Sequence, residues 1–497
     1  MKKYLILFII LISLFTAFGQ ENKNEQDETL VPMNSDTRFE MYKTLAEKGD
    51  AYYQNFLGGL YYHGEGTLKD VKQAFYWWQK SADQGYADAQ FFLGFMYHNG
   101  EGTLKDLEQA FNCFQRSAEQ GNAFAQKELA NLYYNGEGTV KDFKQALYWF
   151  QKSAEQGYAD AQFQLGLVYY NGEGTVKDLQ QAVIWYKKSA EQGNAGAQCN
   201  LGLMYYEGEG TLKDFKQAFY WFNKSAEQGN ASAQCSLGAM FFKGEGALKD
   251  LNQACYWYKK SAEQGYAYAQ HNLALMYYNG EGTVKDLLQA FSWFQKSSIQ
   301  GLDNPQYNLG LMYYNGEGTT KDLQQAFSWY KESAEQGNID AQLNLGVMYY
   351  KGEGTLKDLK QAFFWYQKSA EQGNAKAQFA LSSMYWNGEG TLKDLNQTFY
   401  WCNKSAEQGN TKAQCSLGDM YYNGEGTLKD PKQAFYWYQK SAEQGIAVAQ
   451  YNLGYLYYFG EGTLVDKKQA AIWIKKAYEN GNNKAEKFWN DNELWKY

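Results

Sequence analysis

The chain has 497 residues, of which 44% are hydrophobic and 18% aromatic, and its 47 basic and 55 acidic residues give a formal net charge of −8. An acidic chain is poorly suited to the phosphate backbone of nucleic acids, so we expect no nucleic-acid partner. A chain of this length usually folds as several domains. Here the composition is uniform beyond Thr37, which favours one elongated array.

The N-terminus has the pattern of a secretory signal. Lys2 and Lys3 precede an apolar run over residues 4–18, and Ala17 and Gly19 are small residues just before Gln20. An uncleaved membrane anchor is the alternative, but the run is shorter than the roughly 20 residues that a spanning helix needs. We therefore predict a signal peptide over residues 1–19 and a flexible polar leader over residues 20–36. The mature protein would be exported, periplasmic or secreted, without a membrane span.

A repeat of 36 residues follows the leader. The tripeptide Gly-Glu-Gly recurs without insertion or deletion, its first glycine standing at residues 64, 100, 136, 172, 208, 244, 280, 316, 352, 388, 424 and 460. A fixed period of this size is typical of solenoids, propellers and arrays. Residues 51–481 therefore form twelve repeats.

Each repeat predicts two helices. In residues 159–193 the side chains alike in nearly every repeat are Ala161, Leu165, Val168 and Tyr169, which share one face of a helix. Gly-Glu-Gly then ends that helix. Asp178, with Gln three residues later as its reciprocal capping partner, opens a second helix through Ala182, Trp185, Tyr186 and Ala190.

Short helices with one apolar stripe cannot bury that stripe alone, but stacked hairpins can. The expected ends of the stack are a capping helix within residues 37–50 and a modified helix within residues 482–497. Glycine or alanine at residue 166 and its equivalents fits a close approach of helices, and Ser382 is the exception. Pro431 directly follows the cap Asp430, where proline is tolerated, and Pro305 falls in the first turn of its helix.

The motif resembles the Sel-1-like repeat, a relative of the tetratricopeptide repeat, as the segment Ala195-Gly196-Ala197-Gln198-Cys199-Asn200-Leu201-Gly202 illustrates. The resemblance implies an all-α fold, a right-handed α-α superhelix, whose members act as adaptors, receptors or scaffolds, and it implies that first helices line a concave face. One cysteine-rich branch of the family bridges successive repeats. Here Cys199, Cys235 and Cys415 match one end of that bridge, but Ala190, Ala226 and Ala406 occupy the other, so the bridge is missing.

Candidate sites for chemistry are weak. Cys235 with Cys255, or Cys402 with Cys415, would suit a disulfide, although buried free thiols are the better expectation for residues that replace aromatics. The acidic turns lack the alternating ligands of a calcium loop, and the three histidines lack partners for a zinc site. We find no catalytic set and no place unlike all others, so we expect no enzyme activity, no cofactor and no metal.

The positions that vary between repeats lie 12, 9, 8, 5 and 1 residues before the first glycine, on one stripe of the first helix, opposite its packed face. We expect this stripe to bind a protein or an extended peptide. The alternative is that solvent-exposed positions have varied in sequence without a functional role. A polysaccharide-binding or export-associated envelope scaffold is the second hypothesis. The candidate partner-binding residues, called the first-helix stripe below, are Phe91, Phe95, Phe124, Phe163, Leu167, Tyr268, His271, Tyr307, Phe379, Tyr451 and Tyr455.

Overall fold

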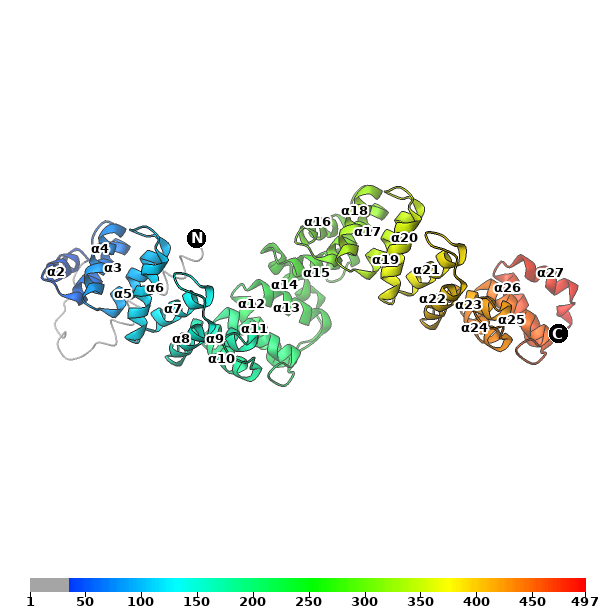
Figure 1. Cartoon of the computed structure of the whole chain (residues 1–497), viewed down its shortest axis with the longest axis horizontal. Helices are drawn as coiled ribbons and strands as arrows, with labels where there is room; N and C mark the ends of the chain where they lie inside the picture. The colour runs from blue at the N-terminus through cyan, green and yellow to red at the C-terminus, as the bar shows by residue number, and fades with distance from the viewer. Residues whose placement is uncertain (1–34) are drawn as a thin grey trace. The chain divides into compact units, whose positions relative to one another are not determined.

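The computed structural model describes residues 35–497, so the expected signal peptide and most of the leader lie outside the described residues. The chain divides into two compact bodies, Met1–Gln228 and Gly229–Tyr497, here called the N-terminal and the C-terminal body. Residues 35–497 form helices and no strand. Within each body, one helical hairpin follows the next in chain order, as expected for a solenoid of repeats (Figure 1).

The N-terminal body begins with α2 (Ser35–Glu47) and continues with five hairpins. Their first helices are α3 (Ala51–His63), α5 (Ala87–Asn99), α7 (Ala123–Asn135), α9 (Ala159–Asn171) and α11 (Ala195–Glu207). Their second helices are α4 (Val71–Asp83), α6 (Leu107–Glu119), α8 (Phe143–Glu155), α10 (Leu179–Glu191) and α12 (Phe215–Glu227).

The C-terminal body contains seven hairpins and ends with α27 (Asn483–Asp491) and the short 3₁₀ helix η1 (Leu494–Lys496). The first helices are α13 (Ala231–Lys243), α15 (Ala267–Asn279), α17 (Asp303–Asn315), α19 (Ile339–Lys351), α21 (Ala375–Asn387), α23 (Thr411–Asn423) and α25 (Ala447–Phe459). The second helices are α14 (Leu251–Glu263), α16 (Leu287–Ser298), α18 (Leu323–Glu335), α20 (Leu359–Glu371), α22 (Leu395–Glu407), α24 (Pro431–Glu443) and α26 (Lys467–Glu479).

The predicted helix ends are confirmed in the hairpin of α9 and α10. Gly172 ends α9 in the left-handed conformation at φ 78°, and the side chain of Asp178 accepts hydrogen bonds from the first backbone amides of α10. The prediction of a reciprocal cap between Asp178 and Gln181 is wrong. The Asp178 amide donates to the carbonyl of Tyr169 at 2.9 Å instead of to the side chain of Gln181, because the turn folds back onto the end of α9.

The core is shared between successive hairpins. Ala161, Leu165 and Val168 of α9 are buried as predicted, and they pack with Phe150 of the preceding hairpin in one cluster. Tyr186 of α10 is buried in the next cluster. Each hairpin therefore covers the apolar stripe of its neighbour, and burial accumulates along the stack.

Within each body, a buried glutamine links successive hairpins. The side-chain amide of Gln162 donates to the carbonyl of Ala154 at 3.1 Å, and its oxygen accepts from Gln192 at 2.7 Å. The same pair of bonds recurs along the chain, for example at Gln342. This position looked merely polar in the sequence, but its side chain satisfies a carbonyl at a helix end that has no partner within the helix.

The Gly-Glu-Gly turn also joins neighbouring hairpins. The hydroxyl of Tyr170 donates to the carboxylate of Glu209, in the turn of the following repeat, at 3.1 Å. A Cβ at Gly174 would lie 2.3 Å from the carbonyl oxygen of Phe143, so the turn fits only without a side chain. The turn is therefore a packing element as well as a helix stop.

The two ends and the prolines follow the sequence pattern. Phe39 and Ala46 of α2 are buried, and Ala485 and Leu494 are buried at the other end. Pro431 is the first residue of α24, after the cap Asp430, and Pro305 lies in the first turn of α17. Both prolines stand where a missing backbone N–H costs little.

Candidate functional site

The structure places the first-helix stripe nearer to the core than the sequence suggested. Only Tyr268 of the stripe is largely exposed, at 57%, and the other members are half-buried. Several of them contact neighbouring rings, as Phe91 does with Phe114 and Phe124. The stripe is therefore a surface of partly covered rings, and its aromatic side chains do not project freely into solvent.

One recurring contact explains why stripe residues at the ninth position before the first glycine are half-buried. In several repeats the side chain nine residues before the first glycine packs against a ring 23 residues later, on the second helix of the same hairpin. The ring centroids are 5.9 Å apart for Phe91 and Phe114, and 6.0 Å apart for Phe163 and Tyr186. Tyr307 contacts Tyr330 in the same way, at 5.9 Å.

Stripe residues also bridge neighbouring hairpins in the N-terminal body. The ring of Phe124 lies 6.0 Å from Phe91 in the preceding repeat and 4.7 Å from Tyr158, the N-cap residue of α9. The three rings form a continuous aromatic surface over successive first helices. An apolar surface of this kind suits a partner that runs along the stack.

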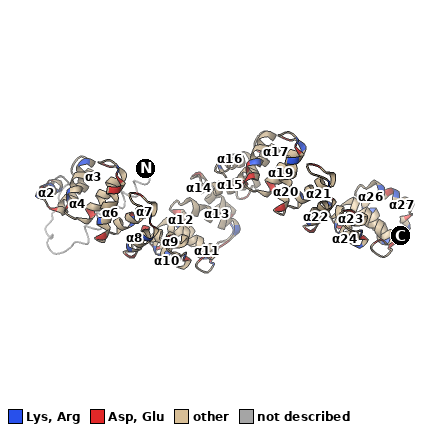
Figure 2. Cartoon of the chain, in the orientation of Figure 1, with Lys and Arg blue, Asp and Glu red and all other residues tan. Residues whose placement is uncertain are grey.

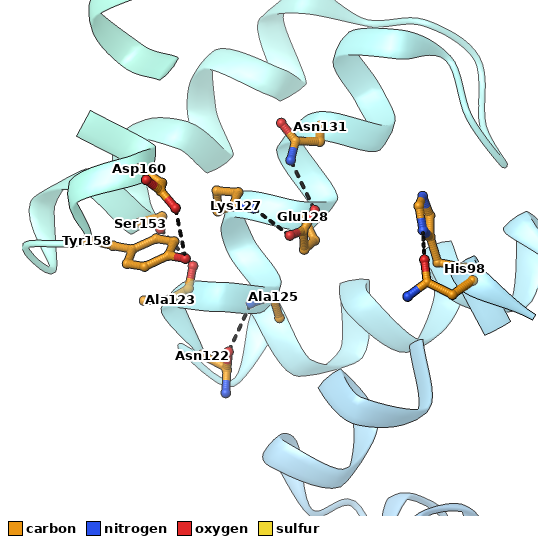
Figure 3. Close-up of polar contacts among 11 residues, drawn as sticks. His98, Asn122, Ala123, Ala125, Lys127, Glu128, Asn131, Ser153, Tyr158 and Asp160 are labelled. Carbon is orange, nitrogen blue, oxygen red and sulfur yellow. Dashed lines mark hydrogen bonds and ion pairs between the residues drawn. The ribbon is translucent and has the colours of Figure 1, made fainter. Parts of the chain in front are cut away.

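The third repeat interrupts the stripe with charge. Lys127 and Glu128 form an ion pair there, and Asn131 donates to the same carboxylate at 3.0 Å (Figure 3). Burial alone would raise the pKa of Glu128, but the Lys127 ammonium and the Asn131 amide outweigh it, and the pKa falls below its ordinary value. The Glu128 carboxylate therefore stays ionised at neutral pH, and the Lys127–Glu128 pair adds charge beside the aromatic rings of the third repeat.

His271 is the titratable member of the stripe. Its ring lies 5.6 Å from Phe294, and burial lowers its pKa to about 4. Its Nδ1 is buried and has no hydrogen-bond partner in the described part of the chain. The imidazole therefore packs as a neutral ring in the place where other repeats carry Phe or Tyr.

Two rows of exposed side chains were not identified from the sequence. An aliphatic side chain at the Gly-Thr-Leu/Val turn is 81–91% exposed in every repeat except the eighth, where Thr320 stands. On the second helices, a half-exposed ring stands at one equivalent position in seven of the twelve repeats, and several carry a lysine ammonium over the ring face, as Lys224 does over Tyr220 at 4.7 Å. The first row had a signal in the sequence, because its turn position is aliphatic in eleven of the twelve repeats, whereas the second-helix position varies among rings, Ile, Asn and Ser.

The six cysteines are free thiols, all buried except the partly buried Cys255. Burial raises the pKa of Cys113 to about 11 and that of Cys402 to about 12, so neither is a ready nucleophile. Across residues 35–497, no three His, Cys, Asp or Glu side chains come together as ligands for a metal ion. Each turn aspartate instead caps a second helix, as Asp178 does.

Basic and acidic residues are interspersed along the helices of both bodies (Figure 2). Among the described helices, none is both long and apolar enough to cross a membrane.

Comparison with known proteins assigns the family. The family model described as Sel1 repeat matches twelve consecutive segments: 51–86, 87–122, 123–158, 159–194, 195–230, 231–266, 267–302, 306–338, 339–374, 375–410, 411–446 and 447–482. This chain belongs to the Sel1 repeat family. The eighth Sel1 repeat is matched only from residue 306, directly after the unusual Pro305.

Two solved structures of repeat proteins are similar to this chain. A protective antigen present in uropathogenic Escherichia coli strains, which displays an SLR fold, is 35% identical over 91% of this chain and 97% of that chain, with a TM-score of 0.78. A Sel1 repeat protein from Oxalobacter formigenes is 29% identical over 75% of this chain and 99% of that chain, with a TM-score of 0.49. No curated protein matches the sequence. Sel1 repeat proteins generally act as protein-interaction scaffolds and are typically non-enzymatic.

Proposed function

We propose that this protein is an exported Sel1 repeat scaffold that binds a protein or an extended peptide along the first-helix stripe. The observation that carries the proposal is the contrast within each repeat. The framework is nearly constant, whereas the residues 12, 9 and 5 positions before Gly-Glu-Gly vary. Those at positions 9 and 5 are mostly apolar, and those at position 12 are mostly polar or charged, with Tyr52, Phe124 and Tyr268 among the exceptions. Variation on one face of a constant scaffold is the arrangement by which repeat proteins achieve specificity.

Two features support a macromolecular partner. The half-buried rings around Phe124 extend over more than one hairpin, which is longer than a small ligand needs. The charged pair Lys127 and Glu128 would fix the register of a partner along an otherwise apolar surface. Apolar anchors with polar interruptions are typical of protein interfaces.

Export is the second part of the proposal. It rests on Lys2, Lys3 and the apolar run over residues 4–18, followed by the small residues Ala17 and Gly19. N-terminal sequencing of the protein from its native cells tests this part. A mature chain that begins at Gln20 supports export, and an intact N-terminus in the cytoplasmic fraction contradicts it.

A second candidate function is the binding of polysaccharide in the cell envelope. The observation that favours it is the row of half-exposed rings on the second helices, since such rings can stack on sugars. Most tryptophans do not contribute, because Trp221 and Trp401 are buried in the core and Trp149 and Trp185 are packed against it.

A matched pair of variants separates the two functions. Leu203→Ser with Tyr268→Ser alters first helices at side chains that are 44% and 57% exposed, whereas Tyr220→Ser with Tyr256→Ser alters second helices at 46% and 49%. The mature chain and both variants are used as bait in envelope extract and extracellular fluid, with helicity checked by circular dichroism. A protein captured by the mature chain and lost only with the first-helix variant supports the proposal. Capture of glycan alone, lost only with the second-helix variant, contradicts it and supports the second candidate.

A further inference from the structure

One place in the C-terminal body is unlike all its equivalents. A cavity of about 420 Å³ opens between the hairpin of α21 and α22 and the following helix α23. Its lining includes the rings of Phe379 and Trp386, the thiol of Cys402, and the carboxylates of Asp419 and Glu425.

The cavity exists because an aromatic ring is missing. Tyr366 and Tyr438 are the counterparts of Cys402 in the neighbouring repeats, and each packs against a glycine 20 residues earlier. In the tenth repeat Ser382 replaces that glycine and Thr398 replaces the usual alanine. These small polar groups bond to the backbone: Ser382 donates to the Thr398 carbonyl at 3.0 Å, and Cys402 donates to the Ala413 carbonyl at 3.3 Å. These small side chains form part of the cavity wall but do not fill the volume that the aromatic ring would occupy.

Asp419 brings a carboxylate to this space. Most other repeats carry an apolar residue at its position. The hydroxyl of Tyr438 donates to Oδ1 at 2.6 Å, the amide of Asn452 donates to the same oxygen at 3.2 Å, and neither bond uses Oδ2. Burial and the nearby Glu425 raise the pKa of Asp419, which shows that the cavity does not compensate this negative charge.

Glu425 lacks the tyrosine partner that the equivalent glutamate has in several other repeats. In the preceding repeat Glu389 accepts a hydrogen bond from the hydroxyl of Tyr350 at 3.0 Å. The corresponding donor for Glu425 would be residue 386, but Trp386 has no hydroxyl. The residues that line the cavity include two carboxylates and no Lys, Arg or His.

The aromatic wall is suited to a cation as well. The ammonium of Lys393 lies 5.0 Å from the centroid of the Trp386 ring, although Lys393 does not line the cavity. An indole beside carboxylates attracts a delocalised planar cation through its ring and through hydrogen bonds to the acids.

We propose that this cavity binds a guanidinium group, supplied by a small molecule or by an arginine side chain of a peptide. The guanidinium stacks against Trp386 and donates hydrogen bonds to Asp419 and Glu425. Its positive charge compensates the two carboxylates, and its N–H groups take the place of the tyrosine hydroxyl that Glu425 lacks. A neutral sugar would contact the ring but would leave both carboxylates uncompensated. The cavity shares Phe379 with the first-helix stripe, but its test measures binding of a guanidinium probe and not of a macromolecular partner, so failure of this proposal and failure of the proposed function are distinguishable.

The test uses the mature chain and isothermal titration with N-acetyl-arginine amide, with N-acetyl-citrulline amide as an uncharged probe of nearly the same shape. The filled variant Ser382→Gly with Thr398→Ala and Cys402→Tyr restores the usual repeat and closes the cavity. Asp419→Asn removes the charge but keeps an oxygen for Tyr438. We expect saturable binding of the arginine probe, weakened at least about tenfold in both variants and for the citrulline probe.

The source of the guanidinium is distinguished by a third probe, the amidated peptide Gly-Gly-Arg-Gly-Gly. Binding at least as tight as that of the arginine probe supports a peptide side chain, and binding of the small probe alone supports a small molecule. Equal binding to the filled variant, equal binding of citrulline, or no binding of either arginine probe overturns the proposal. Unchanged helicity and melting of the filled variant show that its fold is intact.

Discussion

Gly166 of α9 lies directly against the ring of Tyr186 on α10, so closely that a Cβ at Gly166 would be 2.5 Å from Cδ1 of the tyrosine. The same relationship holds between Gly346 and Tyr366, with a corresponding distance of 2.6 Å. Two helices of one hairpin approach each other through this pair, and the ring fills the space that the glycine leaves.

The first prediction follows from this pair. In an isolated helix Gly166→Ala would raise helix stability by about 1 kcal/mol. Here the added methyl group must displace a buried ring, so we expect the free energy of unfolding to fall by about 1–3 kcal/mol. Urea unfolding followed by circular dichroism measures the change. A variant more stable than the natural chain would show that the Tyr186 ring moves aside without an energetic cost.

The second prediction concerns the buried glutamines. Gln162→Ala removes two hydrogen bonds and leaves the Ala154 carbonyl without its side-chain donor. We expect a loss of about 1–3 kcal/mol in the free energy of unfolding. Gln151→Ala is the control, because Gln151 is exposed and bonds only to Glu155 of its own helix. The control should change stability by less than about 0.5 kcal/mol, and equal effects of the two variants would refute the linking role of Gln162.

The third prediction is a pH dependence at His271. Its pKa is about 4 in the fold, below the ordinary value of 6.5 for a histidine side chain, so the unfolded chain binds a proton more readily. Stability from the neutral ring is therefore complete above about pH 6.5 and decreases as the pH falls towards 4, by up to about 3 kcal/mol. His271→Phe should remove this loss.

The measurement for His271 is the difference in unfolding free energy between the variant and the natural chain from pH 7 to pH 4. Taking the difference cancels the titration of carboxyl groups, which is common to both chains. The difference should widen in favour of the variant as the pH falls. A constant difference would mean that the ring of His271 is protonated as easily in the fold as in the unfolded chain.

The fourth prediction concerns thiol accessibility. Cys255 is the partly buried cysteine, whereas Cys113, Cys235, Cys402 and Cys415 are buried and burial raises the pKa of each thiol. A thiol reagent at pH 7.5 should label Cys255 first, and denaturation should expose all six free thiols. Cys255→Ser should abolish the fast phase. Fewer than six labelled thiols after denaturation without reductant would reveal a disulfide.

The sequence predicted most of the scaffold because its signals are local. Gly172 and Asp178 determine where α9 ends and α10 begins, and Ala161, Leu165 and Val168 define a buried face through their spacing alone. The reciprocal cap at Gln181 failed because the competing acceptor, the Tyr169 carbonyl, lies on a different helix.

The parts that the sequence did not reveal depend on pairs of distant residues. The half-burial of Phe163 arises from Tyr186, and the cavity in the tenth repeat arises from Cys402 together with Ser382. Each residue alone looks like ordinary variation. Only the packing of residue i against residue i+20 or i+23 shows that a ring is missing in one hairpin and present in its neighbours.

Photo-cross-linking in the native cells tests the proposed binding face most directly. The photoreactive residue p-benzoyl-phenylalanine replaces Tyr268 on a first helix or Tyr256 on the neighbouring second helix, at side chains of similar exposure (57% and 49%). The proposed function predicts a discrete cross-linked protein from residue 268 and none from residue 256. Cross-links from residue 256 alone, or equally from both residues, would contradict the assignment of the first-helix stripe as the binding face.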